Sequence, residues 1–484
     1  MYKDKYEVVV GLEVHAQLLT ESKLFCGDST TFGSEPNTQV SEISLAHPGT
    51  LPVLNEKVVA LAVKLGLALN CEIASEHFFD RKNYFYPDLP KGYQVSQNSK
   101  PVCLGGYLTI QAESKEKNIR LNRIHIEEDA GKSIHDMDEE FSFIDLNRAG
   151  VPLLEIVTEP DLNSGQEAYS YLTELRRLLR WLQVCDGNME EGKMRCDANV
   201  SVRLKGSTQL GTRVEVKNLN SIRNVKRAIE LEADRLMLLL ENNEPVIQQT
   251  RSYHADSNSS FALRNKEEAD DYRYFAEPDL PLFTITEAYI TSVKNAMPAL
   301  PWQMEKSLMG KFHLSVYDAQ ILCSDKDDAD FFESIIQHTQ HYKAVANWIS
   351  GPLKNYGNEK SISLTKIPIP VEKLAALIAL AEEAEISFNN ASGKIFEAMM
   401  NDPSASPVAL AKSLNLLQES DSSVLEDWIA EVLAGMPAEI KAYQAGKKNL
   451  LGLFAGQVKK LSKGKADMQL TTKMLTEKLS DYHL

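Results

Sequence analysis

Two observations on the sequence predict a mixed α+β protein in three parts. Over roughly the first 290 residues, short segments alternate apolar and polar residues between Gly, Pro and Asn turns, which is typical of half-buried strands. After Pro281 the alternation fades, and apolar residues recur every three or four positions, as on the buried face of a helix. We therefore expect an α+β body, an all-helical middle part and a small helical tail.

The expected domains are residues 1–294, 295–407 and 408–484. The turn-rich stretch 402–407 contains two prolines and predicts the second boundary. A chain of 484 residues is long enough for several domains, each with a core of its own. Apolar spacing predicts helices in the body at 54–69, 165–183 and 221–242, and further on at 285–296, 303–311, 327–339, 341–350, 371–383 and 393–400.

Composition and targeting signals point to a cytoplasmic protein. The chain is 43% hydrophobic and 25% charged, an ordinary soluble balance. No apolar run approaches the ~20 residues that a membrane-spanning helix needs, so we expect no membrane association. The charged start resembles neither a signal peptide nor a transit peptide. The six cysteines form no CxxC or CxC pair, which argues against a disulfide framework.

Charge is distributed unevenly along the chain. The net charge is −16, but residues 441–484 hold nine Lys and three acidic residues. That segment carries 9 − 3 = +6, so the remainder carries −22. A basic tail on an acidic body can be an electrostatic footprint for a polyanion. The alternative is a solvated helical face with no binding role.

Three predicted strands place charged residues on one face and apolar residues on the other, because successive side chains of a strand point to opposite faces. A solvent-facing sheet with cross-strand ion pairs is the alternative. These faces lack the many Lys and Thr of solvated strands and are rich in metal and phosphate ligands. They comprise Glu13, His15 and Gln17; Arg195, Asp197, Asn199, Ser201 and Arg203; and Arg213, Glu215 and Lys217.

Further acids follow the same pattern. Glu127, Glu128 and Asp129 are consecutive and repel one another unless a cation or basic groups neutralise them. Glu155 interrupts the apolar run 153–157, and a buried lone carboxylate is costly unless it is paired or ligated. The stretch 131–133 resembles the end of a P-loop, but the required upstream glycine is Ile126, so we reject that interpretation.

A loop at 80–94 interleaves aromatic residues with Lys and Arg. Such a loop can stack bases and neutralise phosphates, or it can be a packed aromatic lid. Together with the acidic strands it suggests phosphoryl transfer, which needs carboxylates to hold Mg²⁺ and cations to spread charge. The acids at 13, 127, 128, 155 and 197, with Lys82, Arg195, Arg203 and Lys217, supply both types.

Long segments of the chain resemble the B-subunit family of aspartyl/glutamyl-tRNA(Asn/Gln) amidotransferases. The resemblance runs through the body and into the tail and covers essentially the whole chain. The matching segments are residues 11–15, 80–94, 125–132, 145–148, 155–161, 195–199, 215–221 and 270–275, and in the tail Gly452, 456–458 and 463–466.

The resemblance implies a cradle-shaped catalytic domain with an antiparallel sheet, similar in fold to glutamine synthetase, followed by a helical domain and a tRNA-binding tail. It implies that Mg²⁺ and ATP are used to phosphorylate the side-chain carboxylate of Glu on tRNA(Gln) or Asp on tRNA(Asn). Ammonia then displaces phosphate. Because no amidase or glutaminase signature occurs in this chain, the resemblance implies an amidase A subunit and a small C subunit as partners in a heterotrimer.

Family roles are carried over residue by residue. Alternation groups Glu127 with Arg123 and His125, whereas similarity to the family favours Glu128 as the acid that faces the metal. The resemblance implies a catalytic, Mg²⁺-binding cluster of Glu13, His15, Glu128 and Glu155; nucleotide or phosphate contacts from Lys82, Arg195, Asp197 and Lys217; and tRNA contacts from Lys447, Lys448, Lys459, Lys460, Lys463 and Lys465.

One segment departs from the family pattern. Many members carry a zinc site made of a CxC and a CxxC pair near the start. Here the first pair reads Cys26-Gly27-Asp28, and serines, Ser41 and Ser44, stand where the second pair would be. We therefore expect no structural zinc and a loop that holds its fold by packing.

Two rival functions remain open. An ATP-dependent ligase acting on a free small acid would not need the basic tail. A non-catalytic tRNA-binding factor would not need Glu13, His15 or Glu155.

Overall fold

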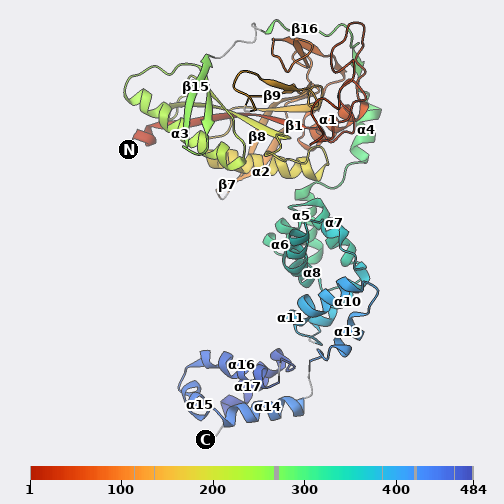
Figure 1. The fold of residues 1–484 in the computed structure, drawn as a ribbon. Helices are drawn as coiled ribbons and strands as arrows, with labels where there is room; N and C mark the ends of the chain where they lie inside the picture. Colours follow the sequence, from red (N-terminus) through yellow and green to blue (C-terminus); the bar gives the residue numbers. More distant parts are fainter. Residues whose placement is uncertain are drawn as a thin grey trace. The chain divides into compact units, whose positions relative to one another are not determined.

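A computed structural model describes residues 2–113, 115–135, 137–265, 272–383, 385–418, 422–462 and 464–481. It divides the chain into two compact units, residues 1–300 and 301–484. The first unit is a mixed structure built on a large sheet, and the second is helical among its described residues (Figure 1). The predicted α+β class is therefore confirmed. No described helix is long and apolar enough to cross a membrane.

The sheet of the first unit has ten strands and places β1 near its centre. Its order is β15-β14-β13-β12-β1-β11-β8-β6-β2, with β7 paired to β8. All pairs are antiparallel except β13 with β14. The bounds are β1 Tyr6–Gln17, β2 Glu72–Ile73, β6 Cys103–Leu104, β7 Tyr107–Ala112, β8 Lys115–Glu128, β11 Pro152–Thr158, β12 Met194–Leu204, β13 Val214–Lys217, β14 Gln249–His254 and β15 Ser259–Asn265.

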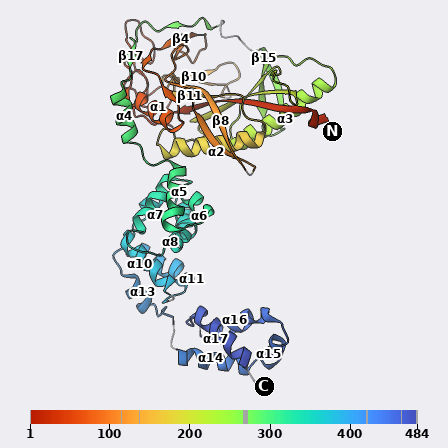
Figure 2. The ribbon, with the colours of Figure 1, turned by 180° about the vertical axis from the view of Figure 1, so that it is seen from behind.

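Helices cover the apolar face of this sheet. α2 (Gly165–Trp181) and α3 (Ile222–Glu241) pack on each other, α2 contacts β7 and α3 contacts β12, and Figures 1 and 2 show both helices along one side of the sheet. α1 (Glu56–Ala68) packs against α4 (Glu287–Asn295). Each of these helices begins after an Asn, Ser or Thr side chain that accepts a backbone N–H of the first turn, which replaces a bond that the helix itself cannot make.

The alternation predicted for the central strands is confirmed. Leu12, Val14 and Ala16 of β1 are buried, and so are Cys196, Ala198 and Val200 of β12. The charged residues between them point to the opposite face. β13 begins at Val214, one residue after the predicted Arg213, which is exposed.

The remaining described strands of the first unit form small sheets that are separate from the large one. β4 (Asp80–Asn83) pairs with β5 (Tyr93–Ser96) and with β16 (Phe275–Ala276). β3 (Glu76–His77) pairs with β17 (Phe283–Thr284), and β9 (Lys132–Ile134) with β10 (Phe143–Asp145). The aromatic loop 84–92 is therefore the connection between β4 and β5.

The second unit contains every helix predicted beyond residue 300, within a few residues at each end. Before residue 400 it also has helices that were not predicted, α6, α9 and α11. One of these, α6, begins after Ser315, whose side chain accepts the N–H of Asp318; this Ser-x-x-Asp signal was present in the sequence. The helices are α5 Pro301–Phe312, α6 Val316–Leu322, α7 Lys326–Ile335, α8 Tyr342–Trp348, α9 Lys354–Lys360, α10 Val371–Glu382, α11 Phe388–Asn390, α12 Phe396–Asn401, α13 Pro407–Ser413, α14 Ser422–Ala434, α15 Pro437–Gln444, α16 Leu451–Leu461 and α17 Met468–Asp481.

A carboxylate organises the loop around Cys26, where we expected no structural zinc. Asp28 Oδ2 accepts hydrogen bonds from the backbone N–H of Ser41 at 2.9 Å, from the Ser41 hydroxyl at 3.0 Å and from the Ser44 hydroxyl. The Ser44 hydroxyl also lies 3.4 Å from Cys26 Sγ. These bonds lower the pKa of Asp28 although partial burial opposes its ionisation. The loop is thus held by hydrogen bonds, which the expectation of packing alone left out.

We expect Asp28→Ala to loosen this loop. The change leaves three donors without their acceptor, which costs about 1–3 kcal/mol for partly buried groups. Limited proteolysis within residues 21–53 should become faster, and the melting temperature should fall. Glu42→Ala, which removes an exposed carboxylate from the same loop, is the control. Equal protease resistance of the two variants would contradict this account.

Candidate active site

The antiparallel register brings charged residues of four strands into rows on the polar face. In one row, His15 of β1 lies between Arg195 of β12 and Glu155 of β11, and Glu155 lies opposite His125 of β8. In the next row, Glu13 lies opposite Asp197. Directly opposite residues of paired strands point to the same face and are close enough to interact. Residues far apart in sequence therefore meet on one surface.

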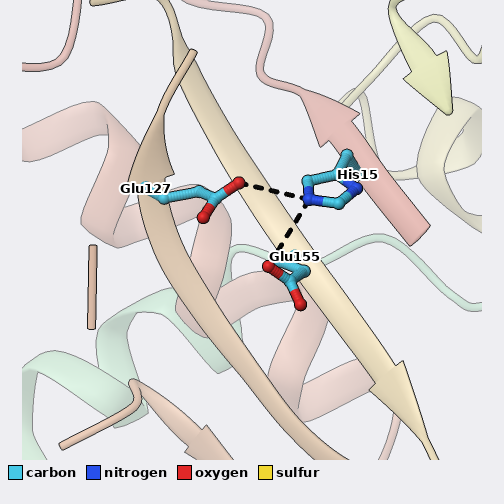
Figure 3. A group of neighbouring side chains, drawn as sticks. All are labelled: His15, Glu127 and Glu155. Carbon is cyan, nitrogen blue, oxygen red and sulfur yellow. Dashed lines mark ion pairs between the residues drawn. The ribbon is translucent and has the colours of Figure 1, made fainter. Parts of the chain in front are cut away.

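His15, Glu127 and Glu155 form a compact cluster (Figure 3). His15 Nε2 lies 3.3 Å from Glu127 Oε1 and 3.4 Å from Glu155 Oε2. His125, which the predicted site omitted, contacts the same two carboxylates. Its Nε2 lies 3.2 Å from Glu155 Oε2 and 3.5 Å from Glu127 Oε2. One ligand atom from each of His15, Glu127 and Glu155 lies within 4.8 Å of the others, as around a bound cation.

The cluster is electrically balanced when both histidines are protonated. Burial opposes the protonation of His15, but hydrogen bonds and charge attraction from Glu127 and Glu155 outweigh it and raise the pKa of His15 to about 10. The same two carboxylates overcome burial at His125 and raise its pKa to about 9. Burial also disfavours ionised Glu127, yet the histidines lower its pKa to about 2. Two imidazolium cations thus neutralise two carboxylates.

The three consecutive acids point to three different partners. Glu127 joins the histidine cluster. Glu128 accepts hydrogen bonds from Lys91 Nζ and from the backbone N–H of Val95. Asp129 pairs with Arg195 at 3.0 Å and lies 3.6 Å from Arg148. Their mutual repulsion is relieved by this separation.

This geometry corrects the predicted cluster at one position. Glu127, and not Glu128, contacts His15 and shares a cavity with Glu13 and Glu155. Glu128 lies beyond the end of that row, in a neighbouring small cavity with Lys91. The physical reason is strand alternation: Glu127 shares the face of His125, and Glu128 takes the face of the buried Ile126.

A cavity of about 300 Å³ covers the polar face. The predicted residues Glu13, His15, Lys82, Glu155, Asp197 and Lys217 all line it. Arg195 does not; its guanidinium is engaged by Asp129. Glu127 and Glu215, which were candidates from the sequence, line it too. The lining that was not predicted includes Ser96, Gln97, Asn98, Arg123, His125, Thr250, Tyr272 and Tyr274.

Cations border the cavity on two sides. Lys217 Nζ pairs with Asp197 and lies 3.3 Å from Glu215, and these acids raise its pKa against the effect of burial. Lys82 Nζ lies 4.8 Å from the centre of the Tyr272 ring. Its pKa is also raised, because charge attraction from Tyr274, Glu127 and Glu155 exceeds the effect of burial. Both lysines therefore stay charged next to the acids.

The structure describes most of the tail lysines that were predicted to contact tRNA, and their contacts with tRNA stay a prediction. Lys447, Lys448, Lys459 and Lys460 are exposed, and Lys465 is half-buried with its Nζ 3.1 Å from Asn415 Oδ1. Lys448 Nζ also lies 4.0 Å from the centre of the Tyr443 ring. Lys463 lies outside the described residues, as do Asp270 and Asp271 of the matching segment 270–275.

The donor set fits a divalent cation. Two carboxylates are the oxygen ligands that Mg²⁺ favours, and an imidazole is also accepted by Mn²⁺ and similar ions. Glu13 and Asp197 add carboxylates in the same cavity. His15 can coordinate only after it loses its proton.

Comparisons with known proteins identify the family of this chain. The model of the "GatB/GatE catalytic domain" family matches residues 8–291, and that of the "GatB domain" matches residues 330–479. Proteins named as the B subunit of aspartyl/glutamyl-tRNA(Asn/Gln) amidotransferase are similar over nearly their full length. That of Oleidesulfovibrio alaskensis is 48% identical over 98% of this chain and 99% of its own. That of Thermodesulfovibrio yellowstonii is 47% identical over 99% and 100%.

A more distant example gives the same result. The protein of that name from Synechococcus sp. is 45% identical over 99% of this chain and 98% of its own. With family models matching most of its length, this chain belongs to the GatB/GatE family, among the amidotransferase B subunits.

Proposed function

We propose that this chain is the subunit that activates and amidates the amino acid on misacylated Glu-tRNA(Gln), Asp-tRNA(Asn) or both. The observation that carries the proposal is the cavity in which Glu13, His15, Glu127 and Glu155 meet between Lys82 and Lys217. Acids that can hold a metal, next to cations that can hold phosphates, are what ATP-dependent phosphoryl transfer requires. The names of the relatives supply the tRNA substrates.

Chemistry requires two steps. A carboxylate is a poor acyl donor, so one of its oxygens first attacks the γ-phosphorus of ATP, which forms an acyl phosphate and releases ADP. Ammonia then attacks the acyl carbon, and the C–O bond to phosphate breaks. The products are the amide and inorganic phosphate. Both steps develop negative charge on oxygen, which fixed positive groups stabilise.

The residues of the chain have separate parts in this scheme. His15, Glu127 and Glu155 would hold Mg²⁺, with Glu13 and Asp197 nearby. The metal supplies charge neutralisation on the transferring phosphoryl group. Lys82 and Lys217 bind phosphate oxygens. Tyr272 and Tyr274 line the cavity together with Lys82. In this scheme their rings limit the access of water to the reacting groups.

The proposed assembly includes partners. We infer that an amidase A subunit supplies ammonia and that a small C subunit completes a heterotrimer, because the relatives are named as B subunits. We also infer that the first unit is the cradle-shaped, glutamine synthetase-like domain. The second unit then holds a helical domain and a tRNA-binding tail, divided near residue 407. The tail has a hydrophobic core of its own, spanning Leu425 to Leu479, which supports that division.

We expect Glu155→Gln to abolish the activating step. The change removes one charge from the cluster, and loss of a metal-site carboxylate costs about 100-fold or more in activity. ADP formation that depends on Glu-tRNA(Gln) should fall by that factor in the assembled complex. Glu159→Gln is the matched control, because Glu159 bonds Asn122 at the surface, outside the cavity. Full activity of Glu155→Gln would favour the non-catalytic alternative.

Cation binding should release protons. His15 has its pKa raised to about 10 in the ligand-free chain, so it carries a proton at pH 7–9 that a metal must displace. The apparent affinity for Mg²⁺ or Mn²⁺ should therefore rise with pH, by up to about tenfold per unit, until pH 10 is approached. Calorimetry in buffers of different ionisation enthalpy should detect roughly one released proton. His15→Gln should release none; equal release from both proteins would rule out His15 as a ligand.

The tail should act through charge. Lys459→Glu with Lys460→Glu removes two exposed cations, so the KM for Glu-tRNA(Gln) should rise and its dependence on salt should weaken. Lys306→Glu with Lys311→Glu makes the same charge change on exposed positions of α5 and should leave KM unchanged. If both double variants, and a chain lacking residues 408–484, kept wild-type kinetics, the free-acid ligase would be the better account.

A further inference from the structure

Besides Nδ1 of His125, two buried nitrogen atoms of the cavity lining have no hydrogen-bond partner among the described residues. They are Nε of Arg123 and Nε2 of Gln97. Both lie on the side of the cavity formed by β8 and the segment after β5. Lys217, on β13, lies on the other side of the sheet's centre. The proposed function so far uses neither residue.

Arg123 differs from most cations in and around the site, although Lys82 too has only aromatic rings as described contacts. Lys217 pairs with Asp197, Arg195 with Asp129 and Lys91 with Glu128. The buried Nε of Arg123 has no hydrogen-bond partner, and within the described part of the chain no carboxylate pairs with its guanidinium. Its position in the sheet, opposite Val157 on β11, places it in the same row as Glu13. A charged group is therefore kept unpaired beside a set of acids.

Gln97 is fixed in orientation. Its side chain is fully buried, and its Oε1 accepts a hydrogen bond of 3.0 Å from the backbone N–H of Ile126. Because a backbone N–H can only donate, the atom that it meets must be the oxygen of the amide. The other end, Nε2, is therefore the NH₂ group, and it has no partner.

Unpaired buried donors are costly. Each such group has given up its hydrogen bonds to water without gaining one from the protein, so two of them in one cavity call for a ligand that accepts hydrogen bonds. A guanidinium matches the two oxygens of a carboxylate or phosphate with two parallel N–H bonds. The amide NH₂ can supply one more bond to the same group. Neither donor would suit a second cation.

We infer that Arg123 and Gln97 form an oxyanion subsite that binds either a phosphate of the nucleotide or the side-chain carboxylate of the aminoacyl group. The inference rests on the proposed function and adds a place for one of its two anionic substrates. Carboxylate and phosphate share the chemistry that this pair recognises, and the two sources are separated by experiment.

The test uses the complete complex and two variants. Arg123→Gln removes the charge, and Gln97→Glu keeps the acceptor for Ile126 while it replaces the free NH₂ with an oxygen that repels anions. Arg120→Gln is the matched control, because Arg120 is on the same strand but pairs with Asp161 at the surface. Binding of MgADP is measured by equilibrium dialysis, and the KM for Glu-tRNA(Gln) is measured by formation of Gln-tRNA.

Each outcome decides between the sources or rejects the subsite. Weaker MgADP binding by tenfold or more in both variants, with an unchanged KM for tRNA, assigns the subsite to phosphate. A tenfold higher KM for Glu-tRNA(Gln) with unchanged MgADP binding assigns it to the carboxylate. If both quantities stay within twofold of the control, the subsite does not exist. If Arg123→Gln fails to fold, Arg123→Lys is measured in its place. That variant keeps the positive charge but loses the two parallel N–H groups of the guanidinium.

Failure of the inference is distinguishable from failure of the proposed function. A wild-type complex that forms neither ADP nor Gln-tRNA would contradict the proposed function itself. An active wild type whose variants at 97 and 123 match the control would contradict the subsite alone.

Discussion

The antiparallel pairing of β1 with β11 on one side and β12 on the other determines where the charged side chains meet. Because the register sets His15 opposite Glu155 and Glu13 opposite Asp197, these two alternate residues of β1 both face the cavity. A shift by one residue would turn these side chains into the apolar layer and bring Leu12 and Val14 to the surface. The packing of α2 and α3 on the apolar face therefore also positions the site.

Charge balance is the second constraint on the site. Within the histidine cluster, two carboxylates are held at short range by two protonated imidazoles, which makes a buried acidic pair tolerable without a metal. Asp197 on β12 is likewise paired with a cation, Lys217 on β13. A bound cation would replace the positive charge that His15 supplies, so folding of the ligand-free chain and binding of metal use one set of groups.

Much of this arrangement was predictable from the sequence, because strand alternation is a local property. It assigned Glu13 with His15, Asp197, and Lys217 to the polar faces of three separate strands, and it grouped Glu127 with His125; that these faces converge came from the structure. Similarity to the family favoured Glu128, and at this position the local rule described the geometry better. Arg195 was expected at the phosphates, but its pairing with Asp129 depends on a turn after β8 that no periodicity describes.

Other features depended on tertiary structure and could not be read from local patterns. The approach of Gln97 to Ile126, and of Tyr272 to Lys82, joins segments that carry no common motif. The loop around Asp28 is similar: the absent cysteines were visible in the sequence, whereas the hydrogen bonds to Ser41 and Ser44 required the fold. The central claim is that the polar face of β1, β8 and β11 is a divalent-cation site for phosphoryl transfer. Anomalous diffraction from crystals of the complex grown with Mn²⁺ and a non-hydrolysable ATP analogue tests it most directly. The account predicts a manganese peak between His15, Glu127 and Glu155 with the triphosphate beside it, and a nucleotide bound elsewhere with no metal in this cluster would contradict it.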